Sequence, residues 1–319
     1  MTSYAFRRCM QAIPTLLGAT LLGFALIHLA PGDPIQFYAA QSASMTPADV
    51  ERLQHQYGLD LPLVVQYFNW LRQLVQLDFG VSFSSHEPVL TAIGARVPAT
   101  LMLTASALAM GAGLGVLVGV LAGLRRGGAF DGLTRLIAVL GHAVPTFWLG
   151  LVFILLFAVK WRLFPSGNIA SLGPAASNPL DHMWHLFPPA FILSLSSLAT
   201  ISRFTRTQTL EVMAQDYVRT ARSKGIAERT VVNRHVLRNA LIPVVTILGG
   251  SLPTLFGGSV VVESVFSWPG IGRLAVDSAF SRDYPVLMGL LLLLAALVVV
   301  GNLLSDLAYG AIDPRIKLT

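Results

Sequence analysis

The stretch from Val286 to Tyr309 reads VLMGLLLLLAALVVVGNLLSDLAY and carries one charged residue, Asp306, near its end. A bilayer core about 30 Å thick requires roughly 20 predominantly apolar residues for a spanning helix. The stretch meets this requirement and predicts a transmembrane helix. Similar runs extend over Met10 to Ala30, Pro98 to Leu124, Leu133 to Trp161, Leu186 to Arg203 and Leu241 to Val265. We therefore predict an all-α integral membrane protein with about six transmembrane helices.

The composition of the chain supports this class. Of the 319 residues, 54% are apolar and only 12% are charged, which is typical of a protein that resides in lipid. The formal net charge is +6, but the basic residues lie in short runs between apolar spans and form no continuous face for nucleic acid. The single cysteine, Cys9, cannot form an internal disulfide. Because the sequence has no internal repeat and no linker, residues 1–319 are expected to form one membrane domain. The first span is expected to remain as a helix and not to be cleaved as a signal peptide.

The distribution of positive charge predicts the topology. Six spans place both termini on one side, together with the loops Arg125 to Arg135 and Arg203 to Arg238, and this side holds about 15 of the 22 Lys and Arg residues. Positive charge marks the cytoplasmic side, so both termini are predicted to be cytoplasmic. The long external segment then covers about residues 31–97 and contains an amphipathic stretch, Leu63 to Val75, that is expected to lie on the membrane surface.

The lysines exclude a phosphate-binding loop, which needs a Lys followed by Ser or Thr after a glycine. The only lysines are Lys160, Lys224 and Lys317, and each is followed by Trp, Gly or Leu. We expect no cofactor in this chain and no enzymatic activity of its own. Any ATP hydrolysis, with ATP and Mg²⁺ as cofactors, must take place in a partner.

Two site chemistries remain as alternatives. Ser251 and Ser259, with His142, are the nearest candidates for an intramembrane hydrolase, but small residues in transmembrane helices more often serve packing. A metal site could use Asp181, His182 and His185, although such pairs are common among ordinary interfacial residues. We predict no metal site and keep a nickel substrate open.

Ionisable residues within spans are functional candidates because burying a charge in lipid is costly. Here they are His28, His142, Glu263 and Asp306. From their positions we expect one deeply buried histidine and no deeply buried carboxylate. A stand-alone secondary transporter would need a buried relay of such groups, so this alternative is disfavoured.

The loop of about residues 206–240 carries the clearest functional signal. Glu211 to Lys224 is predicted to form one polar helix of about 14 residues, roughly 20 Å long, that ends at a cap on Gly225. A second short helix from about Glu228 to Arg238 follows. Together they predict a compact knob that fits a groove on another protein. The residues of this knob expected to contact a partner are Glu211, Asp216, Tyr217, Arg219, Thr220, Ala221, Lys224 and Gly225.

This loop resembles the segment with which bacterial ABC importer permeases dock on their ATPase subunits. The similarity is closest to the dipeptide, oligopeptide and nickel permease family, although Arg219 stands where the wider superfamily has Glu. The matching blocks are DYVRTAR at 216–222, RNA at 238–240, PGDP at 31–34, DFGVS at 78–82, RVPATL at 96–101, VVE at 261–263, WPGIG at 268–272 and RDYP at 282–285. They extend over almost the whole chain.

The resemblance implies a permease subunit of the bacterial inner membrane. Its implied partners are a second homologous permease subunit, two ATPase subunits, an external substrate-binding protein and membrane lipid. The implied cargo is a di- or oligopeptide, with glutathione and nickel complexes as alternatives. The expected pathway or gate residues, for which helix packing is an equally good interpretation, are His142, Phe147, Gly250, Pro253, Gly257 and Glu263.

Overall fold

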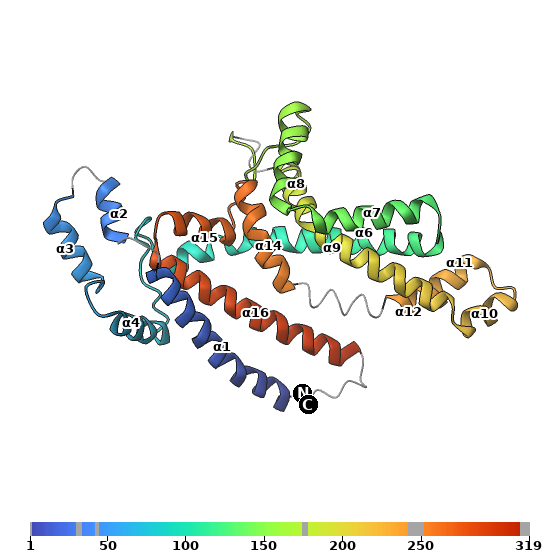
Figure 1. The fold of residues 1–319 in the computed structure, drawn as a ribbon, viewed down its shortest axis with the longest axis horizontal. Helices are drawn as coiled ribbons and strands as arrows, with labels where there is room; N and C mark the ends of the chain where they lie inside the picture. Colours follow the sequence, from blue (N-terminus) through green and yellow to red (C-terminus); the bar gives the residue numbers. More distant parts are fainter. Residues whose placement is uncertain (1, 30–33, 42–44, 174–177, 242–251, 313–319) are drawn as a thin grey trace. The chain divides into compact units, whose positions relative to one another are not determined.

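The computed structural model describes residues 2–29, 34–41, 45–173, 178–241 and 252–312. Within these ranges the secondary structure is helical (Figure 1), and backbone pairing of the strand type is limited to an antiparallel bridge between Val81 and Pro88. The predicted all-α class is therefore confirmed.

The helices vary from single turns to spans of the membrane. They are α1 (Thr2–Leu29), α2 (Pro34–Gln41), α3 (Pro47–Gln56), α4 (Leu63–Val75), α5 (Val89–Gly94), α6 (Val97–Leu124), α7 (Ala129–Ala143), α8 (Thr146–Phe153), α9 (Pro179–Met213), α10 (Asp216–Ser223), α11 (Glu228–Thr230), α12 (Arg238–Ala240), α14 (Leu252–Val265), α15 (Ile271–Phe280) and α16 (Tyr284–Ile312). Two π-helical segments, Ile154–Lys160 and Val231–Leu237, continue α8 and α11.

Four stretches of the described chain are long and apolar enough to cross a membrane: Met10–Leu29, Val89–Leu124, Pro179–Met213 and Tyr284–Gly301. They correspond to the first, second, fourth and sixth predicted spans. The fourth is much longer than the predicted Leu186 to Arg203. The fifth predicted span is described only in part. Residues 242–251 lie outside the described residues, and the part that follows them forms α14.

The third predicted span, Leu133 to Trp161, is wrong as a single straight helix. α7 and the helix that begins at Thr146 are bent by 105° relative to each other. Val144 has extended backbone angles, φ −91° and ψ 127°, because a residue before proline is disfavoured in helical geometry, and Pro145 has no N–H to continue the ladder. The pair is either a broken span or a re-entrant segment.

The chain forms two compact units. The first consists of Met1–Pro98 and Gly270–Val299. Its apolar core joins α5, α15 and α16 through the buried side chains Val89, Ile93, Ile271, Val286 and Leu290.

A buried carboxylate fastens the segment before α5 to the start of α16. Asp283 is 2% exposed and accepts hydrogen bonds from the Ser82 hydroxyl and from the backbone N–H groups of Phe83 and Ser84, both at 3.2 Å. Burying a charged group requires such partners. The blocks DFGVS and RDYP, recognised separately in the sequence, therefore meet at one structural contact.

The predicted amphipathic external stretch forms α4. Its Tyr67 hydroxyl lies 3.1 Å from the Thr20 hydroxyl of α1, and its ring packs edge-on against Phe24. The opposite face remains exposed, with Val64 67% and Phe68 63% accessible. α4 therefore packs on α1 while it keeps an apolar face free.

The second unit consists of Ala99–Pro269 and Val300–Thr319. In this unit α6 and α9 approach each other through glycines at every fourth position of α6. A Cβ on Gly115 would lie 2.9 Å from Ile201 Cβ, and one on Gly119 would lie 2.6 Å from the carbonyl oxygen of Ser202. Gly111 and Gly123 occupy equally tight positions one turn to either side. Small residues at this spacing let helix backbones approach closely in membranes.

An ion pair joins α7 to α9 in the same unit. Asp131 is 1% exposed, and Arg206 Nε and Nη2 both donate to its carboxylate, the latter at 2.9 Å. The backbone N–H of Gly127 also donates to this carboxylate at 3.1 Å. A buried charge with a bidentate partner and a backbone donor is well compensated. α9 is thus held on one side by α6 and on another by α7.

Candidate functional site

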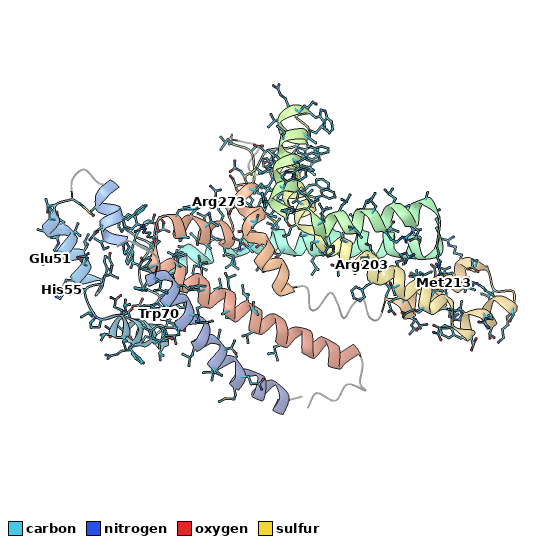
Figure 2. The ribbon with its side chains drawn as sticks, in the orientation of Figure 1. Glu51, His55, Trp70, Arg203, Met213 and Arg273 are labelled. Carbon is cyan, nitrogen blue, oxygen red and sulfur yellow. The ribbon has the colours of Figure 1, made fainter. Side chains whose placement is uncertain are left out.

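The candidate site is the loop that follows α9, residues 214–240, termed here the α10–α12 loop. α10, α11 and α12 lie together at the end of α9 (Figure 1), and Met213 marks that end in Figure 2. Asp216 lies in the first turn of α10, where an acidic side chain interacts favourably with the helix dipole. The loop therefore begins with a new helix directly after α9.

The prediction of one helix from Glu211 to Lys224 is wrong. Glu211 belongs to α9, which ends at Met213, and Gln215 adopts extended angles of φ −72° and ψ 147° before α10 begins. α10 has 8 residues and is about 12 Å long at 1.5 Å per residue. The acidic Asp216, a typical first-turn residue, is the sequence signal that marks this second start.

The loop has an apolar core of its own. The core consists of the buried residues Val212, Val218, Ala221, Val231, Val236 and Ala240. Ala221 is 5% exposed and packs in this core, so it does not lie on the outer face, where a docking residue was expected. The side chains of Val218 and Ala221 follow each other at i, i+3, a spacing that places both on the inner face of α10.

The outer face of α10 is polar and accessible. The side chains of Asp216 and Arg219 are 93% and 78% exposed, and their charged groups lie 3.6 Å apart. Tyr217 is 44% exposed, and its hydroxyl accepts a hydrogen bond from the Asn239 amide at 3.3 Å. Thr220 is exposed, and its hydroxyl donates to the Asp216 carbonyl at 2.9 Å. We call Asp216, Tyr217, Arg219 and Thr220 the outer face of α10.

The turn after α10 is fixed by one glycine and one ion pair. Gly225 has φ +74°, so the predicted glycine cap is confirmed, and Lys224 beside it is exposed. Across this turn, Arg222 donates two hydrogen bonds to Glu228, at 3.1 and 2.7 Å. These bonds lower the pKa of Glu228 and raise that of Arg222. A bidentate pair restricts the relative orientation of α10 and α11.

The predicted pathway residues are not gathered in one place. His142 and Phe147 are exposed on α7 and α8, and Gly257 is exposed on α14. Glu263, also on α14, is completely buried. The backbone of Pro253 belongs to α14, and Gly250 lies outside the described residues.

The expected burial of the ionisable groups is corrected by the structure. His142 is exposed, with Nδ1 3.1 Å from the Ala138 carbonyl and Nε2 3.1 Å from the Thr200 hydroxyl. Glu263 is the buried group, and the Thr100 hydroxyl donates to it at 2.7 Å. Its burial follows from contacts between α6 and α14, which are distant in the sequence.

The His-x-x-His segment at the start of α9 has other contacts. Asp181 accepts hydrogen bonds from the backbone N–H and the hydroxyl of Ser171, both at 2.7 Å. His185 is buried, with Nδ1 3.0 Å from the Asp181 carbonyl. Across the described part of the chain, no group of three or more His, Cys, Asp and Glu side chains is arranged to hold a metal ion.

Sequence reasoning missed the contacts that hold α9, the helix that leads into the α10–α12 loop, against its neighbours. These are the Asp131–Arg206 pair and the contact of α6 with α9 described above. The second had a readable signal, since Gly111, Gly115, Gly119 and Gly123 recur at every fourth residue. The first joins residues 75 positions apart, and no local pattern indicates it.

Comparison with known proteins gives two family matches that together cover most of the chain. Residues 115–318 match the family described as binding-protein-dependent transport system inner membrane component. Residues 1–104 match the N-terminal family of the same membrane components.

Curated relatives are similar over nearly their entire length. The oligopeptide transport system permease protein AppB of Bacillus subtilis (strain 168) is 43% identical over 318 residues, covering 99% of this chain and all of the relative. The dipeptide transport system permease protein DppB of Escherichia coli (strain K12) is 39% identical over 337 residues, covering 99% of both chains. A solved amino acid ABC transporter with histidines shares the fold, with a TM-score of 0.51 and 16% identity; the match covers 71% of this chain and 94% of that chain.

Proposed function

This chain belongs to the family of inner membrane components of binding-protein-dependent transport systems, and from this premise we propose that it translocates di- or oligopeptides delivered by an external binding protein. Family membership makes it a multi-pass inner-membrane permease subunit of an ABC importer. The peptide cargo is supported by the names of relatives that align over 99% or more of their length.

We further propose that the outer face of α10 docks on an ATPase subunit. The supporting observation is the division of the loop into a packed inner side and a polar outer side with four accessible residues. A loop with its own core can present a fixed shape to a partner without first having to fold. Gly225, Lys224 and Glu211 would flank the contact, whereas Ala221 would support it from within.

The proposed assembly has two permease subunits, two ATPase subunits and one external binding protein. ATP binding and hydrolysis in the ATPase subunits, with Mg²⁺ there, would move α10 and bias the permease between inward-facing and outward-facing states. α9 is the element that would carry this movement, because it leads directly into α10 and contacts α6 and α7.

The test uses the complete complex in proteoliposomes, with uptake of a labelled tripeptide and peptide-stimulated ATP hydrolysis as readouts. Thr220→Trp adds bulk to the outer face of α10, so stimulated hydrolysis and uptake should both fall at least several-fold. Thr207→Trp is the matched control, since Thr207 is also exposed and its hydroxyl also donates to the carbonyl four residues earlier, at 3.1 Å. Equal stimulation in Thr220→Trp, in Thr207→Trp and in the unmodified protein would refute docking through this face.

A further inference from the structure

A cavity of about 670 Å³ lies within the first unit. It is bounded by one end of α1, by α3 and α4, and by the start of α16; His55 and Trp70 in Figure 2 mark the α3 and α4 sides. Its volume falls in the range of small-molecule sites, about 300 to 1,000 Å³. Most of its wall belongs to the predicted external segment, residues 31–97.

The wall combines aromatic rings with side-chain amides. Phe24, Trp70 and Tyr284 supply aromatic surface from α1, α4 and α16. The Gln66 amide lines the wall but already donates to the carbonyls of Leu59 and Leu61, at 3.1 and 2.7 Å. The other amides come from Gln56, Asn69, Gln73 and Gln76. Each of these four has both a donor and an acceptor, which is the pairing that a peptide backbone requires. Aromatic walls with a few polar groups are also the usual construction of a ligand pocket.

The formal charge of the wall is entirely positive. Arg72 is exposed, and among the described residues no Asp or Glu lines the cavity. His55, which also lines it, is paired with Asp60 at 2.8 Å, outside the wall. Arginine binds a carboxylate through two parallel hydrogen bonds. The cavity therefore suits a ligand with a carboxylate and is poorly suited to one whose only charge is positive.

His28 provides an acceptor that has no partner. Its Nδ1 lies 2.9 Å from the Phe24 carbonyl, which only accepts, so Nδ1 carries the hydrogen and Nε2 is left as an acceptor. Nε2 is buried and makes no hydrogen bond within the described residues. The imidazole is held by stacking on Phe24, at a centroid distance of 4.0 Å, and by Tyr284 at 5.2 Å. Because Nε2 is buried, His28 contributes its ring to the cavity wall and no hydrogen-bond acceptor within reach of a ligand.

We propose that this cavity is a peptide-binding site of the permease itself, distinct from the site on the external binding protein. The carboxylate of a short peptide binds Arg72, and its backbone pairs with the amides of α3 and α4. The proposal rests on the proposed function for the class of cargo. It adds that the permease has its own recognition of the carboxylate terminus.

The first experiment locates the ligand. A single thiol is introduced by Val81→Cys, at an exposed residue of the cavity wall, in a Cys9→Ser background, and its reaction with a maleimide is followed in the assembled complex in nanodiscs without binding protein. Trialanine should slow labelling in a concentration-dependent manner. Trialanine amide, which lacks the carboxylate, should need about ten-fold higher concentration for the same protection, because a charge-assisted hydrogen bond is lost.

The second experiment tests the recognising residue. Arg72→Gln, in the same labelling background, should weaken trialanine protection about ten-fold and abolish the difference between trialanine and its amide. Arg52→Gln is the matched control, because Arg52 is an exposed arginine of α3 that pairs with Asp49 at 3.0 Å and does not line the cavity. Arg52→Gln should retain the preference for the carboxylate.

Several outcomes would refute peptide binding in this cavity while leaving the proposed transport function unaffected. ATP-driven tripeptide uptake together with no protection by trialanine would show that the cavity binds no peptide. Equal protection in Arg72→Gln and Arg52→Gln would remove the assigned carboxylate contact. Cross-linking of the introduced thiol to the binding protein, unaffected by trialanine, would assign the cavity to that partner. Failure of the proposed function is seen separately, as absence of peptide uptake by the unmodified complex.

Discussion

Replacing Gly119 by alanine should destabilise the protein, whereas the same change at Gly113 should not. Both glycines lie in α6. A Cβ on Gly119 would be 2.6 Å from the carbonyl oxygen of Ser202 and 2.7 Å from Thr205 Cβ, while a Cβ on Gly113 would have nothing within 4 Å. A carbonyl oxygen of the helix backbone cannot rotate away, so α6 and α9 would have to separate.

The magnitude follows from comparing the two variants. Glycine to alanine stabilises a helix by about 0.5 to 1 kcal/mol through backbone entropy, and this gain applies to both sites. Overpacking of a tight contact costs about 1 to 3 kcal/mol and applies only to Gly119. The difference between the variants therefore isolates the contact between α6 and α9, at about 1 to 3 kcal/mol.

The assay is thermal unfolding of the purified complex in detergent, with matched amounts of each variant. At about 2 to 4 °C per kcal/mol, the midpoint of Gly119→Ala should lie several degrees below that of Gly113→Ala. Reduced coupling between peptide and ATP hydrolysis should accompany the loss, since α9 leads into α10. Equal midpoints for the two variants would show that the helices do not rely on this close approach.

Three further predictions concern the contacts of α9 and of the loop. Asp131→Asn should cost about 3 kcal/mol, because it leaves Arg206 partly buried without its anion; unchanged thermal stability would contradict the role of this pair. Gly225→Val should impose about 1 to 2 kcal/mol of left-handed strain on the loop and reduce stimulated ATP hydrolysis with normal membrane insertion, measured from membrane amounts and activity. The ion pair with Arg222 lowers the pKa of Glu228, so it should stabilise the folded protein at pH values above the ordinary pKa of 4.5. This stabilisation should be lost as the pH falls through the lowered pKa. In Arg222→Gln, the thermal midpoint should therefore not show this loss at low pH.

The sequence alone was sufficient for the class of the protein because hydrophobic length is a local property. The runs at Met10–Leu29 and Tyr284–Gly301 can be recognised without knowledge of any partner residue. The bend in the third span was readable in principle, because Val144 precedes Pro145 and proline interrupts helical hydrogen bonding. The residues on both sides of this break are apolar, so hydrophobicity alone predicted one continuous span.

In the candidate site, too, features that depend on local sequence could be predicted, whereas features that depend on long-range contacts could not. The turn at Gly225 follows from residue type, since a left-handed conformation favours glycine. Ala221 was misplaced because its burial depends on Val231 and Val236, which fold back from the following segment. Glu263 was misjudged for a similar reason, as its hydrogen-bond donor Thr100 is 163 residues away.

The junction between α9 and α10 determines how the proposed movement of the loop can reach the membrane. On the membrane side, α9 is held by the glycine contacts with α6 and by the Asp131–Arg206 pair. On the loop side, α9 contacts α10, the π-helical segment Val231–Leu237 and α12, and its Val212 packs in the loop core. A pull on α10 would therefore reach α9 through the loop core as well as through Gln215. Transmission therefore depends on the loop core remaining intact, and substitutions at Val218 or Ala221 should uncouple the complex even though neither side chain lies on the outer face of α10.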